Sequence, residues 1–404
     1  MASSLEKIRV LDLSRVLAGP LCTQILGDLG AEIIKIERPG TGDDTRSWGP
    51  PFLKDHNGRD THESAYYLSC NRNKKSVTVD ITKPDGQKII RDLIAQSDIV
   101  IENFKVGGLE KYGLGYSQLK DRFPKLIYCA ISGFGQNGPM ATEPGYDFMA
   151  QAMGGLMAAT GTPDGQPMKA GVAVSDVMTG LYATIGILAA LHHRDKTGQG
   201  QMVDVALLDV TLAGMTNLAQ YYLTARAVPP RLGNAHSTIV PYQVFDTQDS
   251  HIVIAIGNDA QFHRLCRVLK APDWADDPRF SINSERVIHR DILVPLLAEK
   301  IQTRTTSEWI ALFSENDVPA APVNRMDEVF AMEQIKAREM AISLPHPVTG
   351  QPVNLVGSPL KFSASPVSYH LAPPTLGADT DAVLSELLQI KPGDIQGLKD
   401  RGIV

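Results

Sequence analysis

The sequence predicts an α/β protein with a parallel sheet in a large domain and a second, smaller α+β domain. Two short apolar segments, 8–13 and 31–37, flank a helix that opens at Gly19 and Pro20 and runs to about Leu29. A strand, a helix and a strand of this length form a right-handed βαβ unit with parallel strands. Further apolar strands, each followed or preceded by a helical stretch, are expected at 99–102 and 126–131.

Hydrophobic periodicity and turn residues place the remaining elements. In the large domain we expect strands at 77–81 and 202–207, and helices at 85–95, 145–159, 177–193 and from 208 to about 223. The composition shifts at 227–230, after which a strand at 252–256 and helices at 261–270, 292–301 and 307–316 indicate the smaller domain. The last part holds a helix, a β-like stretch at 353–362 and a final helix after Asp379. We therefore divide the chain into residues 1–225, 226–325 and 326–404.

Composition excludes several classes of function. The chain has 404 residues, 43% of them hydrophobic, and a net charge of −6, so it has no general attraction to nucleic acid or to an anionic membrane. Its four cysteines lie far apart without a metal-binding spacing, which indicates a reducing compartment. No signal peptide or transit peptide is visible, and the longest apolar run, 181–191, is too short to span a bilayer. We expect a cytoplasmic protein, or a mitochondrial matrix protein from which a leader has been removed.

The first βαβ unit predicts a nucleotide at the carboxyl ends of its strands. NAD is one option, with Glu37 on a ribose hydroxyl. The first turn, 14–19, nevertheless reads SRVLAG and lacks the GxGxxG pattern that lets backbone approach a pyrophosphate. Arg38 suits a phosphorylated ribose better than a free diol, so the NAD hypothesis is weak.

Two other segments carry groups that can bind anions. NRNKKS at 71–76 places several donors just before a strand, either as a solvated face or as a site for phosphate or carboxylate. The glycine-rich turn SGFGQNGP at 132–139 can present backbone N–H groups to an oxyanion, or be only a loop. The long irregular segment 39–70 is typical of a functional or mobile loop.

Asp176 is the main candidate for chemistry. It is the one carboxylate in 169–180, an otherwise small and largely apolar stretch that leads into the helix at 177–193. Either Ser175 or Asp176 is a natural N-cap, where orphan backbone N–H groups and the helix dipole favour negative charge. A carboxylate in such a place acts as a nucleophile or base if a substrate reaches it. The alternative is that Asp176 only caps the helix.

A series of motifs resembles class III CoA-transferases, the family of formyl-CoA transferase, carnitine CoA-transferases and the α-methylacyl-CoA racemases. The motifs occur in the family's order and cover essentially the whole chain: LDLSRVLAGP, GDLGAEIIKIERPGTGDDTR, NRNKKSVTVD, IENF, ISGFGQNGP, PGYD, GVAVSDVMTG and TGQGQMVDVALLD. RVLAGP, WGPPF and AHSTIVPYQVF are most similar to members that exchange CoA between succinate and glutarate. The resemblance implies a Rossmann-like large domain, a small inserted domain and an interlocked homodimer.

The resemblance also implies functional residues. Asp176 stands where the family keeps its catalytic aspartate. Lys111 stands where formyl-CoA transferase has arginine, and Leu17 replaces a glutamine, which removes one polar contact. The positions that correspond to CoA contacts are Leu17, Ala18, Arg38, Val79, Asp80, Ile81, Thr82, Asn103, Phe104, Lys105 and Lys111, together with Tyr146 and Asp147.

The mechanism we expect is covalent. Asp176 attacks an acyl-CoA thioester, and the released thiolate then converts the aspartyl anhydride into an aspartyl-CoA thioester that an acceptor carboxylate enters. CoA thioesters and small carboxylic acids are then the substrates, with no metal and no permanently bound cofactor. Backbone N–H groups near Asp176, at 133–135 or at Gly257 are the oxyanion donors we consider.

A dicarboxylate substrate needs a cation for its distal carboxylate. Arg72 is our first choice, followed by Arg46, Lys169 and His236. We expect Tyr146 to hydrogen-bond the substrate. We expect Asp147 to orient its neighbours rather than react, because two nearby carboxylates would raise the pKa of one of them.

Two other functions remain. A racemase of the same family needs a second acid or base, and the residue that matches the racemases' histidine is Tyr146, a poor base at neutral pH. A catalytically silent CoA-binding or nucleotide-binding protein would not need Asp176. The sequence leaves the exchanged acids open among succinate, glutarate, oxalate, itaconate, citramalate and mesaconate.

Overall fold

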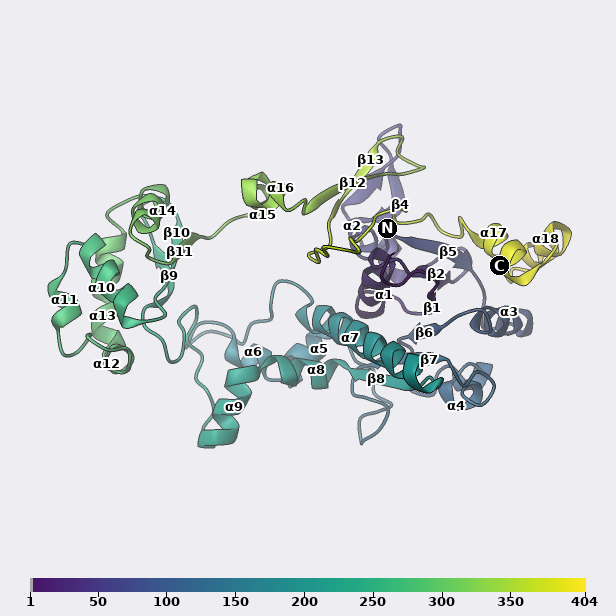
Figure 1. Ribbon diagram of the computed structural model, residues 1–404, viewed down its shortest axis with the longest axis horizontal. Helices are drawn as coiled ribbons and strands as arrows, with labels where there is room; N and C mark the ends of the chain where they lie inside the picture. Colours follow the sequence, from purple (N-terminus) through teal and green to yellow (C-terminus); the bar gives the residue numbers. More distant parts are fainter. Residues whose placement is uncertain (1–2) are drawn as a thin grey trace. The chain divides into compact units, whose positions relative to one another are not determined.

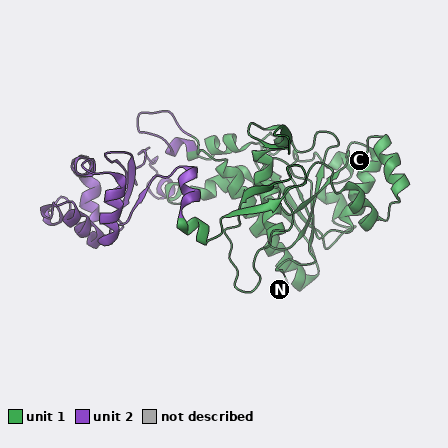
Figure 2. Ribbon diagram, turned by 90° about the horizontal axis from the view of Figure 1, so that it is seen from above, with its two compact units in different colours: residues 1–156, 169–220, 333–404 green, residues 157–168, 221–332 purple. Residues whose placement is uncertain are grey.

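The chain forms two compact units in the computed structural model, which describes residues 3–404 (Figure 1). The larger unit comprises Met1–Leu156, Lys169–Gln220 and Glu333–Val404, and the smaller unit comprises Met157–Met168 and Tyr221–Met332 (Figure 2). The division expected from the sequence was 225/226 and 325/326. In the structure the short segment Met157–Met168 also joins the smaller unit, and the C-terminal segment belongs to the larger one.

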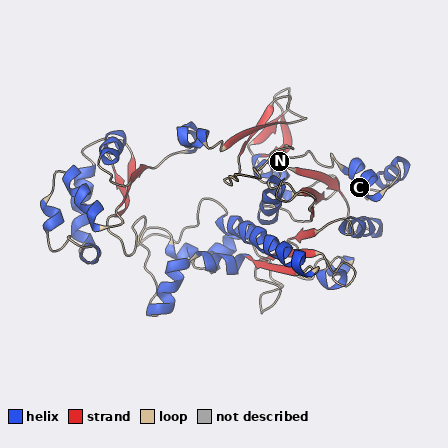
Figure 3. Cartoon of the chain, viewed as in Figure 1, coloured by secondary structure: helices blue, strands red, loops and turns tan. Residues whose placement is uncertain are grey.

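The larger unit is built on a six-stranded sheet in the order β5-β2-β1-β6-β7-β8. Every neighbouring pair is parallel, which confirms the predicted α/β class (Figure 3). The strands are nearly continuous hydrophobic runs, as expected for a sheet covered on both faces. Their bounds are β1 (Arg9–Asp12), β2 (Glu32–Glu37), β5 (Lys74–Thr78), β6 (Ile99–Glu102), β7 (Ile127–Ser132) and β8 (Met202–Ala206).

Helices cover both faces of this sheet. On one face, α1 (Ala18–Asp28) and α7 (Val174–Thr197) pack apolar side chains such as Leu26 and Ile187 into one core. On the other face, α3 (Pro84–Ile94) and the C-terminal helices α17 (Thr380–Leu388) and α18 (Pro392–Asp400) contribute to a second core. The C-terminal helices therefore cover the same face of the sheet as α3, which comes early in the chain.

Small residues let α7 approach its neighbours closely. A Cβ atom added to Gly180 would lie 2.8 Å from the carbonyl oxygen of Ala18 in α1, and one added to Gly186 would lie 2.7 Å from Val203 in β8. The helix has 24 residues, longer than expected, and is long and apolar enough to cross a membrane by length and composition. Its packing against α1, α8 (Leu207–Gly214), β7 and β8 makes it part of the α/β unit.

Shorter elements surround this core. The helical ones are η1 (Asp44–Ser47), α2 (Ala65–Ser69), η2 (Glu110–Tyr112), α4 (Tyr116–Leu119), α5 (Asp147–Met153) and α16 (Glu333–Ala337). Two further helices, α6 (Leu156–Ala159) and α9 (Thr216–Ala225), begin in the larger unit and end in the smaller one. Two antiparallel hairpins are formed by β3 (Phe52–Lys54) with β4 (Asp60–Ser64) and by β12 (Ala341–Pro345) with β13 (Pro352–Val356).

The smaller unit is an α+β structure, as predicted. Its three strands, in the order β11-β10-β9, are antiparallel and pack on helices around Phe262, Leu293 and Phe313. The strands are β9 (Tyr242–Asp246), β10 (His251–Ala255) and β11 (Ala320–Pro322). The helices are α10 (Asp259–Val268), α11 (Asp273–Asp276), α12 (Asn283–Ile288), α13 (Arg290–Ile301), α14 (Thr306–Glu315) and α15 (Met326–Ala331).

Three expected elements differ. The helix expected from 208 to about 223 is divided into α8 and α9 at Thr216, which has a φ of +38°. The helix expected at 145–159 is interrupted after Met153, where Gly155 adopts a φ of +88° that a helix cannot contain. The strand expected at 77–81 begins earlier, at Lys74. The Lys74 side chain is fully buried and its Nζ lies 3.3 Å from Asp12 Oδ2. The strand therefore begins with a buried, ion-paired lysine at a position where a hydrophobic pattern predicts an apolar residue.

Candidate active site

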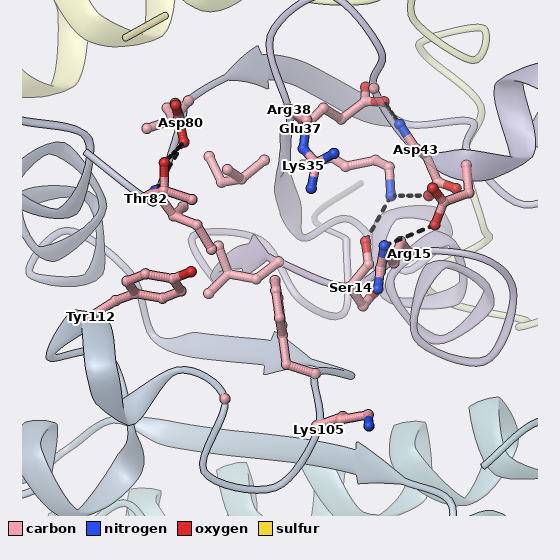
Figure 4. Close-up of a pocket in the computed structure, with 18 of the residues that line it drawn as sticks. Ser14, Arg15, Lys35, Glu37, Arg38, Asp43, Asp80, Thr82, Lys105 and Tyr112 are labelled. Atoms are coloured by element: carbon pink, nitrogen blue, oxygen red, sulfur yellow. Dashed lines mark hydrogen bonds and ion pairs between the residues drawn. The ribbon is translucent and has the colours of Figure 1, made fainter. Parts of the chain in front are cut away.

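A cavity of about 450 Å³ opens at the carboxyl ends of the parallel strands (Figure 4). This is where an open α/β sheet binds its ligand. Most of the residues that the resemblance assigns to CoA lie in its wall. They are Arg38, Val79, Asp80, Ile81, Thr82, Phe104, Lys105 and Lys111.

The cavity is basic at its rim. Arg38, Lys105 and Lys111 are exposed, and in residues 3–404 none of them is paired with a carboxylate within ion-pair distance. The Lys111 ammonium instead lies 4.7 Å from the centre of the Tyr112 ring. Cations that the protein has not already neutralised are suited to phosphate groups.

Asn103 does not line the cavity but shapes it. Its Oδ1 accepts a hydrogen bond from the backbone N–H of Arg15 at 3.0 Å, and its Nδ2 donates to the carbonyl oxygen of Arg15 at 2.7 Å. The Arg15 guanidinium bonds Asp44 at 2.9 Å and stands 6.0 Å over the Phe104 ring. Sequence reasoning missed Arg15 and Tyr112 as wall residues, although Arg15 follows β1 directly and could have been found by that position.

The C-terminus contributes to the same wall. The backbone N–H of Asp80 donates to the carbonyl oxygen of Ile403 at 2.7 Å, and the Asp80 carboxylate accepts from both the backbone and the hydroxyl group of Thr82. The turn after β5 is therefore fixed from both sides.

The loop between β1 and α1 connects this cavity with α7. Ser14 and Arg15 line the cavity, whereas Ala18, which is not in the wall, packs its carbonyl oxygen against Gly180 of α7. Val16, a β-branched residue, is held at a φ of +73°, a conformation that it rarely adopts. The backbone N–H of Val16 donates to the Asp43 carboxylate at 3.3 Å, and this contact stabilises the strained loop.

A network of buried charges supports this loop from behind. Lys35 and Lys74 are fully buried, and the Lys35 ammonium donates to Ser14 O at 2.9 Å and to Asp43 Oδ2 at 2.8 Å. Burial alone would raise the pKa of Asp43, but the Lys35 ammonium and hydrogen bonds from Thr45 hold it at about 2. Burial likewise opposes ionisation of Asp12, yet the charges of Lys74 and Lys35 lower its pKa. All these charges are neutralised within the protein.

The structure corrects the first two choices for a substrate cation. The Arg72 guanidinium is buried and donates to both oxygens of Asp28, at 2.9 and 2.5 Å. Arg46 is buried too, sits between Glu37 and Glu63 and stacks at 3.8 Å on the Tyr67 ring. A guanidinium that is already paired and shielded from solvent cannot receive a substrate carboxylate. The donors of NRNKKS are therefore mostly internal cations rather than a phosphate site.

The other two choices differ in position. Lys169 is exposed on the segment that leads to α7, and within residues 3–404 its Nζ donates only to the carbonyl oxygen of Ala170 at 3.2 Å. His236 belongs to the smaller unit, where its Nδ1 accepts the backbone N–H of Thr238 and its ring stands 5.4 Å from Tyr242. Lys169 thus remains a free cation in the larger unit.

Asp176 lies in the first turn of α7 and is partly exposed. The expectation that Ser175 or Asp176 caps this helix is wrong, because the helix begins at Val174 and its N-cap is Ala173. Within residues 3–404, the Asp176 carboxylate accepts no hydrogen bond and pairs with no cation. Burial raises its pKa to about 7, and the nearby Asp147 carboxylate adds to the increase.

Asp147 performs the capping that was expected of Asp176. Its Oδ1 accepts the backbone N–H of Ser175 at 2.8 Å and that of Asp176 at 3.3 Å. The structure therefore brings Asp147 and Asp176 together, and it leaves the Asp176 side chain free of a capping role. Tyr146, the N-cap of α5, is 65% exposed.

Tyr66 is a neighbour of Asp176 that sequence reasoning missed. Burial raises the pKa of the Tyr66 phenol to about 12, and the negative charge of Asp176 adds to the increase. The ring packs edge-on against Trp48, with 5.3 Å between the ring centres. Both residues come from the irregular segment 39–70, whose length was the one signal of their importance.

Some of the expected oxyanion donors are already used. The backbone N–H of Gly135 donates to Ser132 Oγ at 2.9 Å, and that of Gly257, in the smaller unit, donates to Gln261 Oε1 at 2.7 Å. The N-terminus of α1 offers an alternative, since its N-cap Leu17 supplies no side-chain acceptor. No group of three or more histidine, cysteine, aspartate or glutamate residues able to hold a metal occurs in the part of the chain that the structure describes.

The fold and these groups define a class of enzyme. A Rossmann-like sheet carries a cavity with three exposed cations in its wall, and the loop beside that cavity packs on the helix that presents Asp176, a partly desolvated carboxylate without a counter-ion in residues 3–404. Such a carboxylate can attack an activated acyl group.

Comparison with known proteins identifies the family. The model of CoA-transferase family III matches residues 5–380, and the chain belongs to this family of enzymes. It is 43% identical, over 99% of its length and 90% of the relative's, to the succinyl-CoA:glutarate CoA-transferase of Homo sapiens. It is 45% identical to the succinate–glutarate CoA-transferase of Agrobacterium fabrum, over 96% of each chain. The crystal structure of a CAIB/BAIF family protein from Brucella suis superimposes with a TM-score of 0.85 at 44% identity, covering 96% of this chain and all of that one.

Proposed function

We propose that this CoA-transferase moves CoA from succinyl-CoA to a dicarboxylate, glutarate first, with Asp176 as the nucleophile. The observation that carries the proposal is the Asp176 carboxylate, which has no hydrogen-bond donor and no counter-ion in residues 3–404 and a pKa raised to about 7. Solvation and ion pairing reduce the reactivity of a carboxylate. An accessible carboxylate that is partly desolvated and has no counter-ion in residues 3–404 is suited to attack a thioester.

The reaction proceeds by four carboxylate and thiolate attacks. Asp176 attacks the succinyl thioester carbonyl, which breaks the C–S bond and gives a mixed anhydride and CoA thiolate. The thiolate attacks the aspartyl carbonyl, succinate leaves, and an aspartyl-CoA thioester remains. Glutarate then attacks this thioester and forms a second anhydride, and the thiolate finally attacks the glutaryl carbonyl and regenerates the Asp176 carboxylate. Every step exchanges one acyl bond for another, so no redox cofactor is required.

The cavity supports CoA as the ligand that carries the acyl group. Arg38, Lys105 and Lys111 provide unpaired cations for phosphate groups, and Phe104 and Tyr112 provide aromatic surface. The pantetheine arm would follow the loop 14–18, which runs from the cavity wall to α7. Leu17, Ala18, Tyr146 and Asp147 belong to the Asp176 end of this path rather than to the cavity.

Lys169 is the cation that we assign to the distal carboxylate of the dicarboxylate. It precedes Asp176 on the same segment and is exposed and free of any carboxylate partner in residues 3–404. A single ammonium group on a flexible chain accepts acids of several lengths. Glutarate is favoured because relatives at 43% and 45% identity carry succinate and glutarate in their names.

A homodimer is the assembly that the surface of the larger unit supports. Tyr182 and Ile185, on the outer side of α7, are 47% and 60% exposed, and Tyr146 and Phe148 of α5 are 65% and 56% exposed. Apolar residues that gather on neighbouring helices are typical of a surface that another chain covers. Light scattering would then give twice the mass of the chain in solution.

An acceptor screen tests the proposed reaction. The enzyme is incubated with succinyl-CoA and, separately, glutarate, oxalate, itaconate, citramalate or mesaconate, and the thioesters are identified by mass spectrometry. We expect glutaryl-CoA and free succinate in equal amounts. Hydrolysis to free CoA without a new thioester would contradict the proposal. Solvent deuterium entering the α-position of a 2-methylacyl-CoA would instead support a racemase.

A further inference from the structure

Gln151 of α5 is a buried polar residue that the proposed chemistry does not use. Its side chain has no exposure to solvent. The amide nevertheless makes two strong contacts: Oε1 accepts the backbone N–H of Ala170 at 2.9 Å, and Nε2 donates to Asp147 Oδ2 at 2.7 Å. A buried amide with both ends bonded fixes the groups to which it bonds.

These contacts lead directly to the nucleophile. Asp147 uses its second oxygen to accept the backbone N–H groups of Ser175 and Asp176 at the start of α7. The N-cap, Ala173, has no side-chain acceptor, so Asp147 satisfies donors that would otherwise lack a partner. Gln151 therefore joins the segment before α7 to the first turn of α7 through one carboxylate.

A second contact fixes the same turn from another helix. The buried Thr211 hydroxyl of α8 donates to Ser175 Oγ at 2.8 Å. The backbone around Asp176 is thus held by α5 and by α8, while the Asp176 side chain itself is left free. This arrangement orients a reactive group without neutralising it.

We propose that Gln151 is a positioning residue for the reaction, which holds Asp147 and the segment from Ala170 so that Asp176 faces the thioester carbonyl. The inference rests on the proposed function of Asp176. Attack by a carboxylate depends on near-attack geometry, and a displacement of about 1 Å can reduce the rate by about a hundredfold. Gln151 is fully buried and hydrogen-bonds Asp147 and the backbone, so its effect on the reaction passes through these groups.

The first test replaces Gln151 by methionine, which keeps the volume and removes the hydrogen bonds to Asp147 and Ala170, together with a longer one at 3.5 Å to the carbonyl oxygen of Val172. We expect kcat to fall by about ten- to a hundredfold and the KM for acyl-CoA to change by less than about threefold. The matched control is Gln24→Met in α1, because Gln24 is also buried and also bonds the backbone at both ends, at Arg72 N and Ser69 O. Equal kcat values in the two variants, at equal loss of melting temperature, would overturn the inference.

A second variant keeps the test decisive if Gln151→Met does not fold. Gln151→Glu retains the acceptor for Ala170, and its protonated form can also donate to Asp147. Ionisation of Glu at this position then places a second negative charge against Asp147, next to Asp176 in α7 and Tyr66 in α2, the other titratable groups around the nucleophile. We expect kcat of this variant to fall at alkaline pH, where the parent enzyme keeps a plateau. An unchanged profile would contradict the inference.

The two hypotheses fail in different ways. If Asp176→Ala retains CoA exchange, the proposed function itself is wrong. If Asp176→Ala is inactive while Gln151→Met matches Gln24→Met, only the positioning role of Gln151 is wrong.

Discussion

Two groups of carboxylates in the larger unit have pKa values that are shifted in opposite directions. Asp12 and Asp43 lie among the fully buried cations Lys35 and Lys74, and the pKa of Asp43 is held at about 2 against the effect of burial. Asp176, in the first turn of α7, has no cation partner among residues 3–404, and burial raises its pKa to about 7. Asp12 and Asp43 are more deeply buried than the partly exposed Asp176, yet their pKa values are lowered, so the counter-ions rather than the degree of burial account for the difference.

The comparison distinguishes carboxylates that stabilise the fold from a carboxylate that is available for reaction. A buried carboxylate with a cation contributes to stability and is chemically quiet, whereas one without a cation costs stability and keeps its reactivity. The same distinction applies to the cations, since Arg46 and Arg72 are paired inside the fold and Arg38 and Lys111 are open to the cavity.

The largest expected effect comes from Asp176→Ala. CoA exchange should fall by about a thousandfold or more, because each covalent intermediate forms on this carboxylate. CoA binding, measured by calorimetry, should persist. The free energy of unfolding at pH 8 should stay equal or rise, because an uncompensated charge has been removed. CoA exchange near the parent rate would show that Asp176 is not the reactive carboxylate.

Lys35→Met should reduce stability, in contrast to Asp176→Ala. The free energy of unfolding should fall by about 3–5 kcal/mol, because Asp43 and Asp12 lose a buried cation. The control is Lys75→Met on the adjacent strand, where the partly exposed ion pair with Glu32 is worth about 1 kcal/mol or less. Denaturant titration measures the free energy of unfolding of both variants. Equal decreases would show that the buried ion pairs contribute no more to stability than the partly exposed pair.

The pH dependence sharpens the same contrast. In the free enzyme, kcat/KM should rise with pH around a midpoint near pH 7 and then level off, as Asp176 ionises. Between its ordinary pKa of 3.8 and about 7, the folded state binds more protons at Asp176 than the unfolded state does, so this group lowers stability as pH rises. Asp43 behaves oppositely, and its contribution to stability is lost as pH falls from 3.8 toward 2. A kcat/KM that is flat from pH 5 to 9 would contradict the assignment.

The smallest expected effect is that of Lys111→Ala. The KM for acyl-CoA should rise by about three- to tenfold while kcat stays constant, because an exposed ammonium beside a phosphate contributes little in water. Added salt should reduce the difference between the variant and the parent. Lys120→Ala, which removes an exposed lysine outside the cavity wall, serves as the control and should leave KM unchanged.

Much of this architecture was predictable from local signals. Hydrophobic runs predicted the parallel strands, and the residues at the carboxyl ends of those strands line the cavity. Asp176 was selected from the stretch before its helix together with the family resemblance, and its role as the nucleophile stays a prediction. The roles of charged side chains were not predictable, because a sequence does not show which ions meet in space. Arg72 appeared free until Asp28, 44 positions earlier, proved to be its partner. Tyr66 and the capping role of Asp147 likewise depend on contacts between segments far apart in the chain.

The central claim is that Asp176 becomes covalently acylated during each turnover. Enzyme mixed with succinyl-CoA and quenched during turnover with hydroxylamine should carry a hydroxamate on the peptide that contains Asp176, as read by tandem mass spectrometry. Enzyme without acyl-CoA should carry none. A fully active enzyme with no modification at Asp176, or with the modification on another carboxylate such as Asp147, would contradict the account.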